Sequence, residues 1–168
     1  YQNIFIGPAV TGTVINNNLV TTDNNLVTGT GLAYGGNNDV VSAPFVAGDL
    51  VAIFTPTTAL TAGKTITLTF PADTTLNTAN IAATDFVIAQ LGGAVVAPSA
   101  VVADNTAKTV TLTVAAGSLS SSGLGRLSIA LSSTAGGNEI IEPPGATTSG
   151  VFAFATNTSP ADTGSINK

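Results

Sequence analysis

The residues that could carry chemistry are few, and they lack the partners that catalysis requires. The chain has 168 residues and contains no His and no Cys, so it offers neither an imidazole base nor a thiolate nucleophile. Glu139 and Glu142 flank two isoleucines and could present two carboxylates, the pair used in glycoside hydrolysis. Aromatic residues make up only 5% of the chain, however, which does not favour a sugar-binding cleft. The sequence therefore predicts that the protein is not an enzyme.

The charge balance excludes a class of partner. Nine acidic residues stand against four basic residues, which gives a formal net charge of −5. Four cations are too few to line a groove that follows a phosphate backbone, so nucleic acid is not an expected partner. No apolar run approaches the roughly 18 residues that a membrane-spanning helix needs, so no membrane span is expected.

The elements that must position any site are predicted to be β-strands. Apolar residues recur at every second position between clusters of turn-forming residues, which is the pattern of half-buried strands. In Gly63–Pro71, for example, Ile66, Leu68 and Phe70 share one face, and the positions between and before them at 65, 67 and 69 are threonine. The other predicted strands are Val40–Phe45 paired with Leu50–Phe54, Asp85–Gln90, Ala94–Val102, Thr109–Val114, Arg126–Leu131 and Gly150–Thr156. A hairpin is predicted around Asp23 and Asn24, and a short helical turn within Thr78–Thr84. We therefore expect an all-β chain that folds as a single immunoglobulin-like or jelly-roll β-sandwich with an extended N-terminal strand.

The segment from Ile4 to Val14 is the most informative part of the chain. Its alternating pattern predicts one long strand that presents Ile4, Phe5, Ile6, Pro8, Val10 and Val14 to a partner. Eleven residues reach about 35 Å, enough to cross a sandwich or a groove on a neighbouring molecule. Pro8 lacks an N–H and so restricts this strand to a sheet edge. Two interpretations stay open: the first strand of its own domain, or a donor strand (residues 1–15) that completes the sandwich (residues 16–168) of another copy.

A resemblance favours the second interpretation. The runs GKTITLTFPADTTL, TDFVIAQLGG, DNTAKTVTLTV, LSIALSST, NEIIEPPGA and GVFAFATNTSPADTG resemble immunoglobulin-like modules of prokaryotic cell-surface and filament proteins. Together with the N-terminal segment, the chain is similar to subunits of archaeal bundling pili, the bacillar matrix fibre protein and archaeal cannulae. The resemblance implies a structural subunit of an extracellular, cell-surface filament or pilus, a homopolymer built by donor-strand complementation.

The composition agrees with that location and leaves one alternative. Charged residues make up only 8% of the chain, so its polar surface depends on Thr, Ser and Asn, which is more typical of extracellular than of cytosolic proteins. The alternative function is a cell-surface adhesin or a carbohydrate-binding β-sandwich module.

Three smaller features are candidate sites. Asn157-Thr158-Ser159 is an N-glycosylation sequon that follows the last predicted strand, so Asn157 is a candidate acceptor of a glycan. No cofactor is expected, although the Asp- and Asn-rich turns at residues 23–25, 37–39 and 104–105 leave calcium as an alternative to simple turn chemistry. Lys64 and Asn157 also resemble the isopeptide pairs of Gram-positive pilins, which require a buried acid such as Asp85 or Glu139. A solvated lysine is the alternative.

Overall fold

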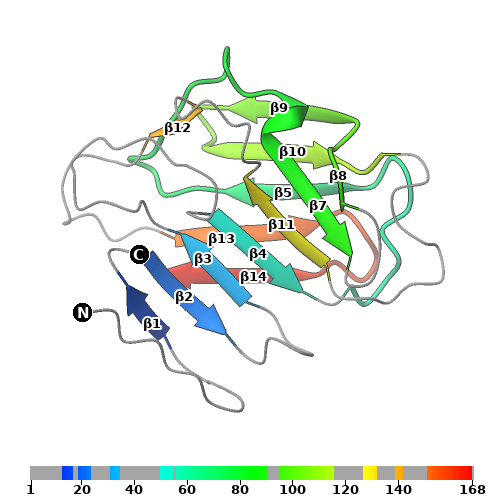
Figure 1. Cartoon of the computed structure of the whole chain (residues 1–168), viewed down its shortest axis with the longest axis horizontal. Helices are drawn as coiled ribbons and strands as arrows, with labels where there is room; N and C mark the ends of the chain where they lie inside the picture. The colour runs from blue at the N-terminus through cyan, green and yellow to red at the C-terminus, as the bar shows by residue number, and fades with distance from the viewer. Residues whose placement is uncertain are drawn as a thin grey trace.

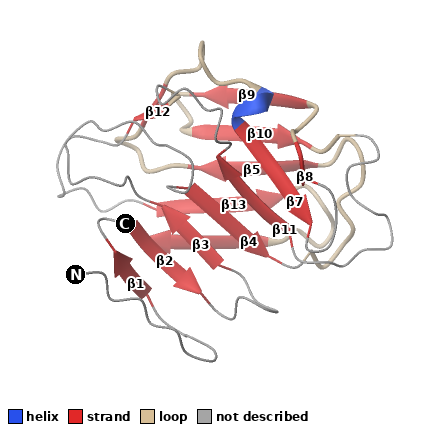
Figure 2. Cartoon of the chain, viewed as in Figure 1, coloured by secondary structure: helices blue, strands red, loops and turns tan. Residues whose placement is uncertain are grey.

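The structure is a computed structural model that describes residues 13–16, 19–23, 31–34, 50–54, 56–90, 95–115, 127–131, 139–141 and 151–167. These residues form antiparallel strands and a single 3₁₀ turn, η1 (Ala83–Asp85), as Figures 1 and 2 show. The strands lie in two layers that face each other. The protein is therefore an all-β sandwich, as the alternating sequence pattern predicts.

The first sheet has seven strands in the order β1-β2-β3-β4-β11-β7-β8. Their bounds are β1 (Thr13–Asn16), β2 (Leu19–Asp23), β3 (Gly31–Tyr34), β4 (Leu50–Phe54), β11 (Leu127–Leu131), β7 (Phe86–Gln90) and β8 (Val95–Val96). Each strand pairs antiparallel with its neighbours in this sheet. Among the described strands, the two edges of this sheet are therefore β1 and β8.

The second sheet has five strands in the order β14-β13-β5-β10-β9. Their bounds are β14 (Thr163–Asn167), β13 (Val151–Thr156), β5 (Thr65–Thr69), β10 (Thr109–Thr113) and β9 (Ala100–Asp104). A separate two-stranded ladder joins β6 (Thr75–Leu76) to β12 (Ile140–Ile141). The edges of the second sheet are β14, which lies against β2 and β3 of the first sheet, and β9.

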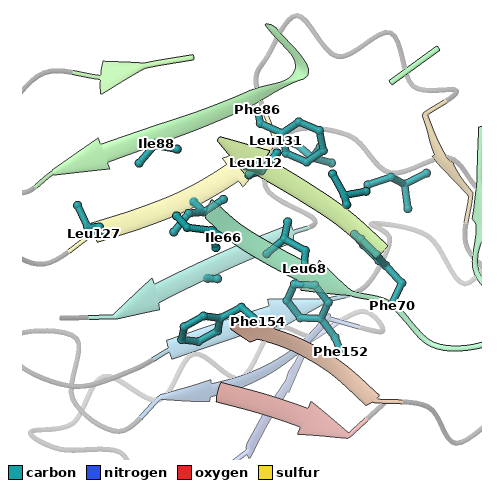
Figure 3. Close-up of a cluster of buried hydrophobic side chains, with 14 of the residues drawn as sticks. Ile66, Leu68, Phe70, Phe86, Ile88, Leu112, Leu127, Leu131, Phe152 and Phe154 are labelled. Atoms are coloured by element: carbon teal, nitrogen blue, oxygen red, sulfur yellow. The ribbon is translucent and has the colours of Figure 1, made fainter. Parts of the chain in front are cut away.

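One hydrophobic core fills the space between the sheets. In β5 and β10 the even-numbered residues are fully buried, while the threonines between them lie on the other face of the sheet. Figure 3 shows the buried side chains of both sheets meeting in this space. Phe54 of β4 stacks on Phe154 of β13 with ring centroids 4.5 Å apart, so this aromatic pair joins the two layers directly. Burial of each such side chain stabilises the fold by about 1.5–3 kcal/mol.

The strands with the clearest alternation are confirmed. The predicted strands Gly63–Pro71, Thr109–Val114 and Arg126–Leu131 correspond to β5, β10 and β11, within one or two residues at each end. Predicted strands Asp85–Gln90, Leu50–Phe54 and Gly150–Thr156 correspond to β7, β4 and β13. These segments supply nearly all of the buried core, so the hydrophobic pattern alone was sufficient to place them.

The predicted strand Ala94–Val102 was wrong as a single element. Residues Val95–Val96 pair with β7 in the first sheet, whereas Ala100–Asp104 pair with β10 in the second sheet. Pro98 lies between them and is buried. Because proline has no N–H to donate to a ladder, the chain leaves one sheet at this point and enters the other.

One predicted pairing was wrong. β4 is paired on both sides, by β3 and by β11, so it cannot pair with Val40–Phe45, which lies outside the described residues. The hairpin predicted around Asp23 and Asn24 is present but displaced: Asp23 is the last residue of β2, and the strand that follows and pairs with it antiparallel is β3. The helical turn expected within Thr78–Thr84 is present as η1, shifted to Ala83–Asp85.

We predict that the core contact between the layers dominates stability. Phe154→Ala removes a ring that is only 2% exposed and stacks across the sandwich, so it should lower the free energy of unfolding by about 3–5 kcal/mol. Val102→Ala is the matched control, because Val102 is 66% exposed and its truncation should change stability by less than about 0.5 kcal/mol. Denaturant unfolding of both variants measures the difference. Equal effects would contradict this description of the core.

Candidate assembly edges and modification site

The N-terminal donor segment leads into an edge strand. Val14 lies in β1, where it pairs with Thr21 of β2 in the same chain. The other proposed contact residues, Ile4, Phe5, Ile6, Pro8 and Val10, lie outside the described residues. The proposed boundary between residues 15 and 16 falls inside β1. Only one side of β1 pairs with a described strand, so β1 is an edge of the seven-stranded sheet among the described strands.

The second open margin is β9. Val101 and Ala103 are only partly buried against the core, although their side chains face the inside of the sandwich. Val102 on the other face is the most exposed large hydrophobic residue described. The strand contains no lysine or proline, the residues by which edge strands usually prevent pairing with other chains. Among the described strands, β9 is therefore an edge without such protection, and the sequence analysis missed it because it had merged β9 with β8.

Asn157 lies in the connection between β13 and β14 and extends the ladder of the second sheet. The Thr65 amide N–H donates to Asn157 Oδ1 at 2.9 Å, and the Asn157 N–H donates to the Thr65 carbonyl oxygen at 3.1 Å. The residue is exposed. The side-chain nitrogen of Asn157, Nδ2, is the atom that would carry a glycan, and it takes no part in these two bonds. The position is thus compatible with the sequon, although it does not follow the last strand of the chain, because β14 comes after it.

A hydrogen-bonded network holds the same connection. The buried hydroxyl groups of Thr156 and Thr158 lie 2.7 Å apart, and the Asp162 N–H donates to Thr156 Oγ1 at 2.8 Å. The Thr57 N–H donates to both carboxylate oxygens of Asp162, at 3.0 and 3.1 Å. Thr57 follows β4 of the first sheet, whereas Asp162 precedes β14 of the second. The carboxylate therefore ties the two sheets together at this end of the sandwich.

The isopeptide interpretation is not supported by the arrangement of the strands. Lys64 and Asn157 lie at the end of the sandwich where β5 begins. The two acids named for the reaction lie at the other end of the sandwich. Glu139 adjoins β12, and β12 pairs with β6, which follows the end of β5. Asp85 lies at the start of β7, whereas the end of β7 is the part that lies near Asn157. Asp85 Oδ2 also accepts the Ala82 N–H at 2.6 Å. Neither Asp85 nor Glu139 therefore lies beside Lys64 and Asn157.

The acidic turn at Asp104 and Asn105 is occupied by the protein's own hydrogen bonds. Asp104 Oδ1 accepts the N–H groups of Thr106 at 2.7 Å and Ala107 at 2.9 Å. Asn105 Oδ1 accepts the Leu76 N–H and the Lys108 ammonium. The other two turns that could bind calcium, at residues 23–25 and 37–39, lie outside the described residues except for Asp23. Within the described ranges, no three acidic side chains cluster as a metal site would require.

The carboxylate of Asp73 is buried without a hydrogen-bond partner among the described residues. Both of its oxygens are shielded from solvent. A buried acceptor without a partner costs about 1–3 kcal/mol. Because no further acidic residues gather around it among the described residues, a lone carboxylate does not form a metal site. We find no structural feature that offsets this cost.

Comparisons of the chain with protein-family models, with curated proteins and with solved structures found no match. In the part of the chain that the structure describes, no helix has the length and apolarity needed to cross a membrane. The site assignments above therefore depend on the geometry of this chain alone.

We predict that Asn157 has a structural role that is separate from any glycan. Asn157→Ala removes the acceptor of the Thr65 N–H and should lower the free energy of unfolding by about 1 kcal/mol. Ser159→Ala is the control, since it destroys the sequon while the exposed Ser159 side chain is simply shortened, and it should leave stability unchanged. Intact-mass measurement of protein from its natural host, before and after Ser159→Ala, reads the glycan itself. Equal stability of the two variants would contradict the role given to Asn157.

A pH dependence follows from Asp104. The backbone N–H groups of Ala107 and Thr106 hold the pKa of this carboxyl below its usual value of 3.8. Its contribution to stability is thus complete above the unfolded pKa of about 3.9 and is lost as the pH falls through the lower folded pKa. Asp104→Asn should therefore lose less stability than the wild type between about pH 5 and pH 2. Denaturation midpoints across that range test this, and parallel curves would refute it.

Proposed function

We propose that the protein is the structural subunit of an extracellular filament or pilus, which polymerises head-to-tail when each copy donates its N-terminal strand to the next. The observation that carries this proposal is the placement of β1 at an open sheet edge, directly after the alternating segment Ile4–Val10. A segment that leaves the sandwich at its margin can extend away from it. The pairing of β1 with β2 anchors the segment to its own subunit.

An unprotected edge on the same subunit supports the proposal. No described strand pairs with the outer side of β9, and Val101 and Ala103, which pack against the core there, are only partly buried. An added strand would pair with β9 through its main chain and cover these residues with its inward side chains. Because the donor segment and β9 are different surfaces of one molecule, the contact is head-to-tail, and it generates an open filament when the rotation between successive copies does not close a ring.

Side-chain burial alone does not hold the donor segment in place. Burial of Ile4, Ile6 and Val10 would contribute about 1.5–3 kcal/mol each. Ordering about ten residues costs about 1–2 kcal/mol for each residue, so main-chain pairing must offset the remainder. Main-chain hydrogen bonds add to this without requiring any charged residue. The link would therefore depend little on salt, in contrast to an ionic interface.

The alternative of a carbohydrate-binding module receives less support. All five phenylalanines of the described residues (Phe54, Phe70, Phe86, Phe152 and Phe154) are at most 3% exposed. Aromatic rings that stack on sugars must lie at the surface, so none of these five phenylalanines offers such a platform. Strand donation remains the function for which the geometry gives the most support.

The proposal predicts the behaviour of a truncated subunit. Deletion of residues 1–12 leaves β1 and the whole described sandwich intact, so the protein should remain folded but should no longer form filaments. Ile6→Asp should act in the same direction, because it places a charge on the inserted face, while Gln2→Asp serves as a control outside the alternating segment. Electron micrographs and circular dichroism measure the two properties. Filaments of normal length from the truncated chain would refute strand donation.

A further inference from the structure

The hydrogen-bond pattern of β10 shows which way its backbone groups point. In the register of β5 with β10, the Phe70 N–H donates to the Lys108 carbonyl oxygen at 2.8 Å. Hydrogen-bonded pairs recur at every second residue of an antiparallel ladder, so Val110 and Leu112 direct their N–H and C=O groups toward β5. The three threonines of β10, which alternate with them, therefore direct their own N–H and C=O groups toward β9.

The same alternation determines which backbone groups of β9 point outward. Thr111 is paired with Val102, so the N–H and C=O groups of Val102 face β10. The N–H and C=O groups of Val101 and Ala103 point the other way, where no described strand pairs with them (Figure 1). Their side chains pack against the core. A strand added antiparallel, as all ladders of this sheet are, must therefore place opposite each of them a residue that has a free N–H and an inward side chain.

The N-terminal segment of a second copy meets these conditions in one alignment. Its even-numbered positions are the apolar ones, so even-numbered residues lie opposite Val101 and Ala103. Pro8 has no N–H and cannot take either place, because it would leave a carbonyl oxygen of β9 without a donor. The alignment that satisfies both conditions places Ile6 opposite Val101 and Ile4 opposite Ala103.

The other alignments that keep the even-numbered residues inward fail. A shift of two residues in one direction turns the polar Gln2 inward, and a shift of two or four residues in the other direction brings Pro8 opposite β9. A shift of six residues brings Gly12 opposite β9, although β1 of the donor's own sandwich begins at the next residue, Thr13. No chain would then remain to pass between two molecules. The chosen alignment leaves residues 9–12 as a connection that can span about 13 Å.

The outward face of the same alignment accounts for an exposed hydrophobic residue. Val102 is 66% exposed, the largest exposure of any large hydrophobic residue described. Phe5 is the one large apolar residue among the odd-numbered positions from 3 to 13, and it falls directly opposite Val102. This pair is a non-hydrogen-bonded one, the geometry that brings side chains closest. An aromatic ring opposite a β-branched side chain stabilises a ladder. The outward residues thus select the alignment that the inward residues and Pro8 require.

We propose that β9 accepts the N-terminal strand of a second copy antiparallel and in a single register. The opposed residues are Ile4 with Ala103, Phe5 with Val102 and Ile6 with Val101. This inference rests on strand donation as the function, and it adds the direction of the strand and the residues that determine its register. Pro8 limits the register because it must lie past the end of β9, and Phe5 favours the register because it covers Val102.

Paired cysteines test the register in the full-length chain, which contains no cysteine of its own. Phe5→Cys with Val102→Cys opposes two residues whose Cα atoms should lie about 4.5 Å apart, within the range of about 4.4–6.8 Å that a disulfide spans. Phe5→Cys with Ala100→Cys is the matched control, because this diagonal pair should lie about 7–8 Å apart. Mild oxidation of assembled protein should give a ladder of linked oligomers with the first pair and at least fivefold less with the second.

The outcomes separate the register from strand donation. Equal or stronger ladders from the Ala100→Cys pair would overturn the register and leave strand donation standing. No ladder from either pair, in filaments that still require residues 1–12, would also overturn the register alone. Disulfides confined to single chains would refute both, because the segment would then pair with β9 of its own molecule.

Replacement of Pro8 tests its role while Phe5 is kept. In Pro8→Ala, the residue at position 8 can donate to Val101, so the alignment that places Gly7 opposite Val102 becomes available. Gly7→Cys with Val102→Cys should therefore form at least fivefold more linked oligomers in the Pro8→Ala chain than in the chain that retains the proline. Equal yields in the two chains would overturn the control of register by Pro8.

Discussion

An open β-sheet has two edges whose backbone N–H and C=O groups lack partners, and the organisation of this protein depends on how its four edges are satisfied. β14 is covered by its position against β2 and β3 of the facing sheet. β8 is only two residues long and so offers little to pair with. β1 and β9 are the two edges that remain among the described strands. In the proposed assembly, the chain that precedes β1 would supply a strand, and that strand would pair with β9 of the next copy.

The core explains why so few charges suffice. Stability comes from a single apolar cluster between the layers, joined by the Phe54–Phe154 stack, and from main-chain ladders. Polar side chains contribute mainly at the ends, where Asp162 and Asn157 accept backbone N–H groups from Thr57 and Thr65. Since none of these contacts is an ion pair between side chains, the surface is left free to present threonine and alanine. That surface property is what makes self-association chemically reasonable.

The sequence predicted the elements whose alternation is dictated by burial. β5 and β10 have a clean period of two because one face meets the core and the other bears threonine, so their positions could be read from the residues. β14 was not predicted, because Gly164 and Ser165 lack the apolar, β-branched character of a strand. It forms a strand because the connection that follows β13 brings it back to pair antiparallel with β13. The change of sheet at Pro98 was missed because Ala94–Val102 is apolar on both sides of Pro98 and Ser99 and was therefore treated as one strand. Pro98 was a signal against a continuous strand, but the sequence does not show that the two halves pair in different sheets. The edge at β9 follows from that change of sheet, so it was missed with it.

The central claim is that the N-terminal strand of one copy completes the sandwich of another. A helical reconstruction of the filament by electron cryo-microscopy, at a resolution that separates strands, tests it most directly. The account predicts continuous density from β1 through residues 10 to 4 that leaves its own subunit and runs beside β9 of the adjacent subunit. Density that returns these residues to a sheet of their own subunit, with no strand from a neighbour in either sheet, would contradict it.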